Sequence, residues 1–114
     1  MTLQKHLPDW IKSTMDKYNV KLLPRALRDL DSIYAYIAIE KQSPANAKGQ
    51  TDRIKNAILN LDTFPQAHQL RQIGRFADQG YRQLLVDNYM IIFRIEEDKK
   101  TVYVVTVQYQ GRNI

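Results

Sequence analysis

The sequence predicts a small α+β domain in which an antiparallel helical hairpin packs on an antiparallel β-sheet. In the first half of the chain, apolar residues recur every three or four positions, as they do on the buried face of a helix. The last third contains three consecutive segments rich in β-branched and aromatic residues, separated by short polar turns. A chain of 114 residues is long enough to bury one hydrophobic core, so we expect one domain.

A short strand is predicted between Tyr18 and Pro24, because Val20 and Leu22 alternate there with polar neighbours. Pro24 ends this strand and suits the first turn of a helix. The helix follows at once, with apolar residues at steps of three and four. These residues are Leu27, Leu30, Ile33, Tyr34 and Ile37.

A second helix is predicted after the segment "QSPANAK", with Ser43 as a candidate N-cap and Pro44 at the first helical position. Pro65 stops it. Its apolar stripe consists of Ala47, Ile54, Ile58 and Leu61. The link between the two helices is short, so they must form an antiparallel hairpin.

The C-terminal third predicts a three-stranded antiparallel meander. Residues 64–80 show no clear period and are interpreted as an ordered loop. The strands follow as "YRQLLV", "YMIIFRI" and "TVYVVTVQY", with turn residues at Asp87-Asn88 and in "EEDKK". The continuous apolar run "IIF" indicates a central strand that is buried on both faces.

Composition narrows the chemistry that the chain can perform. It has no cysteine, and its two histidines, His6 and His68, lack the spacing of a zinc site, so we expect no metal and no cofactor. His68 is interpreted as a loop residue. No segment is apolar enough for a membrane span or a signal peptide, which favours a cytoplasmic protein without a membrane partner. The net charge of +5 suits a polyanionic or acidic partner, and equally a solvated basic surface.

The first residues of the chain are expected to lie outside the domain. We predict an N-terminal extension over residues 1–17 and a single domain over residues 18–114. Met15 is a natural start for a chain whose first strand opens at Tyr18. Alternatively, residues 1–14 form an accessory helix with Leu3, Leu7, Trp10 and Ile11 on one face.

Four segments, in this order, resemble the RelE/ParE superfamily of toxins from bacterial type II toxin-antitoxin modules. They are "ALRDLDSIYAYI", "ILNLDTFP", "GYRQLLVDNYMIIFRI" and "VVTVQYQGRN". The resemblance covers roughly residues 18–113. It implies a RelE/ParE-like fold, with a short N-terminal strand, a helical hairpin and a C-terminal meander.

The resemblance also implies a growth-inhibiting toxin that a cognate antitoxin neutralises by covering the sheet and hairpin grooves. RelE-like members cut mRNA on the ribosome, and ParE-like members inhibit DNA gyrase. We favour the gyrase branch because residues 24–65 allow two helices of about four to five turns each, which is closer to ParE-like toxins. A metal-independent RelE-like endoribonuclease stays open as an alternative. So does an inactive relative that binds the antitoxin for autoregulation.

Metal-free RNA cleavage needs groups that accept a proton, stabilise phosphate charge and donate a proton. The resemblance places Arg82 and Arg112 at basic positions of the family. Leu84 and Met90 occupy positions where RelE-like enzymes can carry basic residues. RelE-like enzymes also have a tyrosine close to the C-terminus, and Tyr109 can take its place here only if the tail folds back. We therefore predict Arg82, Tyr109 and Arg112 as candidate catalytic residues, grouped as a basic, aromatic surface on one side of the sheet.

Three further arginines are predicted to bind the target. Arg71 and Arg75 lie in the loop and can line a groove for a polyanion, or equally face solvent. Arg94 is the third, although an arginine in a buried strand often pairs with a carboxylate such as Glu96 or Asp87. Tyr81, Tyr89 and Tyr103 are expected to pack within the sheet and not to stack on bases.

Overall fold

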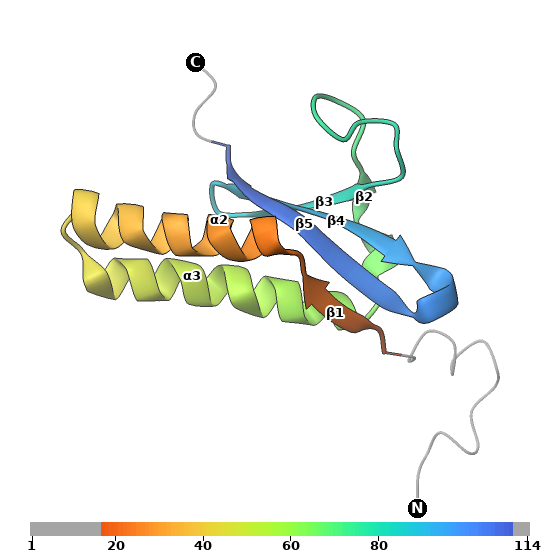
Figure 1. The fold of residues 1–114 in the computed structure, drawn as a ribbon, viewed down its shortest axis with the longest axis horizontal. Coiled ribbons are helices and arrows are strands. Elements are labelled where there is room, and N and C mark those ends of the chain that lie inside the picture. The colour runs from red at the N-terminus through yellow and green to blue at the C-terminus, as the bar shows by residue number, and fades with distance from the viewer. Residues whose placement is uncertain (1–16, 111–114) are drawn as a thin grey trace, which may run out of the picture.

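The computed structural model describes residues 17–110. Figure 1 shows a helical hairpin set beside a twisted sheet. The hypotheses about Met15, residues 1–14 and Arg112 concern residues outside the described range. The helices and strands are β1 (Asn19–Leu22), α2 (Pro24–Ala35), α3 (Pro44–Leu59), β2 (Gln69–Leu70), β3 (Arg82–Val86), β4 (Tyr89–Glu96) and β5 (Thr101–Tyr109).

The sheet has five strands in the order β1-β5-β4-β3-β2. Strands β3, β4 and β5 form the predicted antiparallel meander, with the turn at Asp87-Asn88. β1, however, pairs parallel to β5, so the sheet is mixed and not wholly antiparallel. The alternation in residues 18–24 indicated a strand but carried no information about its partner, because the hairpin and meander separate the two strands in sequence.

One strand was missed in the segment interpreted as a loop. After a 3-10 turn at Pro65–Ala67, residues Gln69 and Leu70 pair with Gln83 and Arg82 as the edge strand β2. A strand of two residues is too short to show alternation, so no sequence pattern could reveal it. The strand fixes where the following loop, residues 71–81, leaves the sheet.

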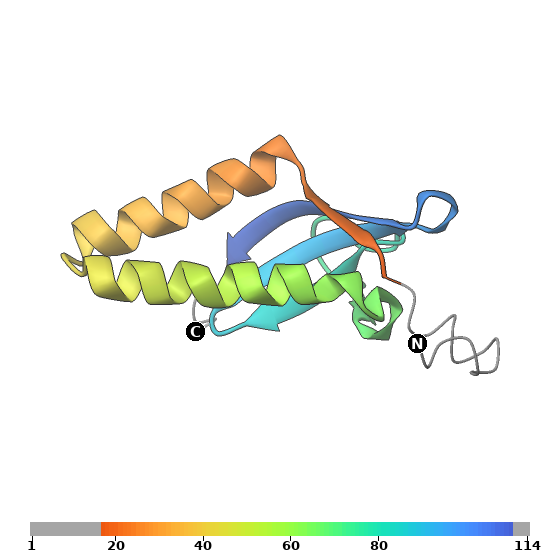
Figure 2. The same cartoon turned by 90° about the horizontal axis from the view of Figure 1, so that it is seen from below.

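The predicted helical hairpin is confirmed, with a π-helical turn at Tyr36–Glu40 between α2 and α3. Figures 1 and 2 show that its tip extends beyond the sheet, and Figure 2 shows that the helices diverge toward the sheet. The predicted apolar face of α2 is only partly buried, since Leu27 and Tyr34 are 52% and 43% exposed. Leu30 of that face lies in the core as predicted, together with Ala26, which the prediction did not include. The buried stripe is narrow because α2 packs mainly against β5.

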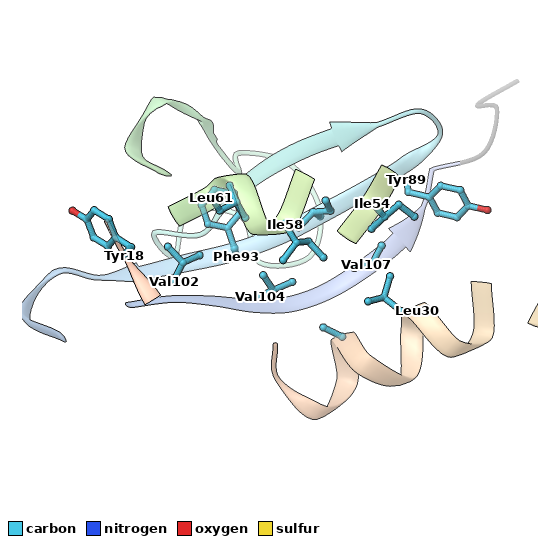
Figure 3. Packing of buried hydrophobic residues seen from close by; sticks show 12 residues of the cluster. Tyr18, Leu30, Ile54, Ile58, Leu61, Tyr89, Phe93, Val102, Val104 and Val107 are labelled. Carbon is cyan, nitrogen blue, oxygen red and sulfur yellow. The ribbon is translucent and has the colours of Figure 1, made fainter. Parts of the chain in front are cut away.

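The core lies between the hairpin and one face of the sheet (Figure 3). The predicted stripe of the second helix, from Ala47 to Leu61, is buried as expected. Strand β4 is buried on both faces from Tyr89 to Phe93, which confirms its central position. Figure 3 places Tyr18 and Tyr89 at opposite ends of this core.

A β-bulge in β5 sets which side chains near its end face the helices. Ile92 pairs with Thr106 and Phe93 with Val104, so Val105 is an extra residue. Asp29 of α2 accepts hydrogen bonds there from the Thr106 hydroxyl and, at 3.0 Å, from the Val107 amide. Val107 and Tyr109 consequently lie on the face of the sheet that the helices cover.

Candidate functional site

Arg82 begins β3 on the helix-covered face of the sheet, where it pairs with Phe93. Its Nη1 donates a 2.7 Å hydrogen bond to the carbonyl oxygen of His68. The His68 ring packs edge-on against the Phe93 ring, at 5.8 Å between centroids. Burial, together with the nearby Arg82 charge, lowers the pKa of His68 and so favours its neutral imidazole.

Beside Arg82, three polar side chains tie distant segments together. The Tyr18 hydroxyl donates a 2.7 Å hydrogen bond to Glu97 Oε1, and Gln66 Nε2 donates to Glu97 Oε2 at 2.9 Å. The Lys100 ammonium lies over the Tyr18 ring, 4.8 Å from its centre. The bonds from Tyr18 and then Gln66 lower the pKa of Glu97, because they favour its ionised form. We call Tyr18, Gln66 and Glu97 the carboxylate clasp.

The carboxylate clasp should make stability depend on pH. The pKa of Glu97 in the folded chain lies below its ordinary value of 4.5, so the clasp stabilises the fold above that value. This contribution is lost as the pH falls through the folded pKa. In urea denaturation between about pH 6 and pH 3, Glu97→Gln should lose less stability on acidification than the wild type. Parallel curves for the two proteins would contradict the assignment.

Tyr109 lies far from Arg82, although both side chains are on the helix-covered face. Tyr109 pairs with Tyr89 at one end of the meander, while Arg82 pairs with Phe93 at the other. Val86 pairs with Tyr89, so the two sites are four residues apart along the strands, or roughly 13 Å at the usual rise per residue. The structure does not bring these two predicted catalytic residues together.

Tyr109 instead forms one wall of an apolar pocket of about 440 Å³ between the hairpin and the sheet. Its ring packs against the Tyr89 ring, 5.4 Å away. We call this the aromatic pocket; it is lined by Ser32, Ile33, Tyr36, Ile37, Lys41, Tyr89 and Tyr109. Burial raises the pKa of the Tyr89 hydroxyl, with smaller contributions from Tyr109 and Tyr36. Lys41 is the basic side chain among the lining residues.

The predicted target-binding arginines lie away from the helices. Arg94 alternates with the core residues Phe93 and Ile95, so it projects from the opposite face of the sheet. Its guanidinium stacks over the Tyr103 ring at 4.3 Å. The expected pairing with Glu96 is present but long, at 3.9 Å.

Arg71 reaches the same face through a 3.0 Å hydrogen bond from its Nη1 to Gln83 Oε1. Its Nε donates to the carbonyl oxygen of Arg75, also at 3.0 Å, which holds the loop against the strand. The Arg75 guanidinium lies 5.2 Å from the centre of the Phe76 ring. The structure thus brings together Arg71 and Arg75, the two loop arginines that the sequence suggested could line one groove.

The sequence did not single out Tyr36 of the aromatic pocket or Gln83 beside Arg71. Tyr36 was not singled out because it belongs to the π-helical turn, which breaks the helical period. Gln83 was not singled out either, although strand alternation places it on the face opposite to Arg82, where it accepts the hydrogen bond from Arg71. Within residues 17–110, no cluster of histidine, cysteine and acidic side chains could hold a metal ion. No helix in that range is long and apolar enough to cross a membrane.

Several solved toxin-antitoxin structures share this fold. The chromosomal ParDE system of P. aeruginosa contains a chain 20% identical, with a TM-score of 0.66 over 82% of this chain and 97% of that one. RelBE2 of Mycobacterium tuberculosis has 19% identity and a TM-score of 0.56, over 86% and 97% of the chains. The intact E. coli RelBE complex contains a chain with 15% identity and a TM-score of 0.55, over 83% of this chain and 99% of that one. No curated protein matches the sequence.

These likenesses define the fold as that of RelE/ParE toxins. The model of the family "ParE toxin of type II toxin-antitoxin system, parDE" matches residues 20–114, and the chain belongs to this family. It is therefore the toxin component of a type II toxin-antitoxin module.

Proposed function

We propose that this toxin inhibits growth by acting on DNA gyrase and is neutralised by a cognate antitoxin. The observation that carries the proposal is the match to the ParE family, which extends over the whole domain from β1 onward. The hairpin supports it, because α2 and its π-helical turn together run from Pro24 to Glu40, and α3 runs from Pro44 to Leu59. Helices of this length were the reason for favouring the gyrase branch.

The environment of Arg82 disfavours ribonuclease chemistry. A nuclease must bring proton-transfer groups and a cation to one phosphate. The Arg82 guanidinium donates a hydrogen bond to the His68 carbonyl oxygen. Leu84 packs against the core, and Met90 is buried on the other face of the sheet. Tyr109 lies at the opposite end of the strands. On this proposal Arg82, Tyr109 and Arg112 would bind the target or the antitoxin and would not transfer protons.

Two assays with the purified chain separate the branches. We expect it to block supercoiling of relaxed plasmid DNA by gyrase in the presence of ATP, and to leave mRNA intact in a cell-free translation reaction. Ribosome-dependent mRNA 5′ ends with unaffected gyrase would establish the RelE-like alternative, in which His68 beside Arg82 becomes a candidate base. An inactive relative would fail both assays and cause no growth arrest on induction.

We propose that the antitoxin covers the aromatic pocket. The solved relatives whose descriptions name both components, the ParDE system and the RelBE complexes, pair a toxin of this fold with its antitoxin. In this chain Tyr36 and Tyr109 are more than half exposed, although both line the pocket. Exposed aromatic side chains around an apolar pocket are typical anchors of protein interfaces.

Loss of one pocket aromatic should weaken antitoxin binding without unfolding the toxin. Truncation of a central interface aromatic costs on the order of 2 kcal/mol, or roughly thirtyfold in Kd. We therefore expect Tyr36→Ser to raise the Kd for the antitoxin by about this factor in calorimetric titration. Tyr34→Ser is the matched control, because Tyr34 is an exposed tyrosine of α2 outside the pocket. Equal losses in both variants would remove the pocket from the interface.

A further inference from the structure

The face of the sheet that the helices leave uncovered carries a basic and amide-rich surface. Side chains alternate along a strand, so those that do not enter the core project from this face. Its polar and aromatic members include Lys21, Gln83, Arg94, Tyr103 and Gln108, all at least partly exposed. Two apolar residues of β4 on this face, Met90 and Ile92, are buried. Glu96 is the acidic side chain of β4 on the same face. We call this surface the outer face.

A pocket of about 270 Å³ opens at the edge of the outer face, beside the loop of residues 71–81. Four carboxamides line it, and no carboxylate does. They belong to Gln69, Gln72, Gln83 and Gln110. A carboxamide offers both a donor and an acceptor, the combination that reads the hydrogen-bonding edge of a nucleobase. We call this the amide pocket.

Arg71 adds a fixed positive charge to the amide pocket. Two hydrogen bonds, to Gln83 Oε1 and the Arg75 carbonyl, hold its guanidinium in place. Its Nη2 group donates no hydrogen bond within residues 17–110, and neither Arg71 nor Arg75 forms an ion pair with a carboxylate in that range. An oriented guanidinium with a spare donor is suited to a phosphate.

The Arg94–Tyr103 stack lies on the same face of the sheet as the amide pocket. Gln83 of the pocket pairs with Ile92, and Arg94 is two residues from Ile92 along β4, on the side away from the pocket residue Met90. Two residues span roughly 7 Å at the usual strand rise. Lys21 pairs with Tyr103 on the far side. The flat guanidinium of Arg94 over an aromatic ring can serve as a platform for an unpaired base. Cations thus flank a stacking platform and a base-sized pocket.

We propose that the outer face binds a single-stranded nucleic-acid segment, with one base in the amide pocket and its neighbour on the Arg94–Tyr103 stack. Arg71, Arg75 and Lys21 neutralise the phosphates. The assignment of this segment to DNA, and not RNA, rests on the proposed action on gyrase, whose substrate is DNA. An acidic peptide would use the cations alone and would leave the amides and the stacking platform without a role.

The test is fluorescence anisotropy with labelled single strands of about 12 nucleotides and the full-length toxin, without gyrase. Arg94→Gln should weaken binding to DNA roughly tenfold through loss of stacking. The Arg94 charge also attracts the phosphate next to the stacked base, so its loss should lower the slope of log K against log salt by about 0.7. Arg28→Gln is the matched control, because it removes the same charge from an exposed position on α2.

A second variant separates base recognition from charge. The wild type should distinguish homopolymeric DNA strands from one another. Gln69 lines the amide pocket but does not hold Arg71, so Gln69→Leu should bind all of these strands alike with the salt slope of the wild type. Thermal melting of both variants checks the fold. No binding at low salt, or an equal loss in Arg28→Gln, overturns the site. Much tighter binding to RNA of the same sequence overturns the assignment to DNA.

The supercoiling assay is independent of this measurement. Gyrase inhibition by a chain that binds no oligonucleotide would overturn the outer-face site and leave the proposed function standing. Base-selective DNA binding without gyrase inhibition would overturn the proposed function and leave the outer-face site standing.

Discussion

Phe93→Ala should destabilise the fold by about 3 to 5 kcal/mol, the range for removing a large aromatic side chain from a core. Phe93 is fully buried in the central strand β4, between β3 and β5. Its ring also packs against the edge of the ring of His68, the residue that follows the 3-10 turn at Pro65–Ala67. The truncation therefore leaves a cavity that two strands and this turn must close. Urea denaturation followed by circular dichroism measures the free energy of unfolding.

Leu85→Ala provides the comparison for Phe93→Ala. Leu85 is an apolar residue of the neighbouring strand β3, but it is 58% exposed on the outer face. Its truncation should change the free energy of unfolding by no more than about 0.5 kcal/mol. If Phe93→Ala and Leu85→Ala lowered the free energy of unfolding equally, the placement of the core on the helix-covered face would be wrong.

Asp29→Ala should cost about 1 to 3 kcal/mol, because it leaves polar groups at the β5 bulge without their acceptor. The Asp29 carboxylate accepts hydrogen bonds from both the Thr106 hydroxyl and the Val107 amide. Thr106 is fully buried, so water cannot readily replace the lost bond. The free energy of unfolding in urea again measures the effect.

Asp31→Ala is the matched control for Asp29→Ala. It removes the same charge from the same helix at an exposed position, where no hydrogen bond or ion pair forms within residues 17–110. Its stability should stay within about 0.5 kcal/mol of the wild type. Equal destabilisation by both variants would show that helix charge, and not the bulge contact, is responsible.

The Asp29 contact also connects stability to the aromatic pocket. The bulge at Val105 shifts the alternation of β5 so that Tyr109 faces the helices and meets Tyr89 and Tyr36. We therefore expect Asp29→Ala to weaken antitoxin binding under conditions where the variant remains folded. Asp31→Ala should bind the antitoxin as tightly as the wild type.

The local sequence determined the elements that carry a strong period. The second helix repeats its apolar residues from Ala47 to Leu61, and the meander alternates or runs continuously apolar, so each pattern matched one type of structure. The order of these elements then pointed to the RelE/ParE superfamily, and the family match bears it out. Helix periodicity was less informative for α2, whose buried stripe is narrow and centred on Ala26 and Leu30.

The partners of the strands were decided only by the tertiary structure. Nothing in the residues around Val20 specifies a parallel pairing with β5, because that pairing joins opposite ends of the domain. The two-residue strand β2 forms only because β3 offers it an edge. Such contacts depend on how the hairpin and meander pack, and they leave no mark on local periodicity.

The candidate sites show the same division. The sequence identified Arg82, Tyr109, Arg71 and Arg94 as residue types suited to binding anions or bases. The tertiary structure decided that Arg82 and Tyr109 lie at opposite ends of the helix-covered face, while Arg71 and Arg94 share the outer face. Strand register and a single bulge set these positions, because a shift of one residue moves a side chain to the other face of a sheet.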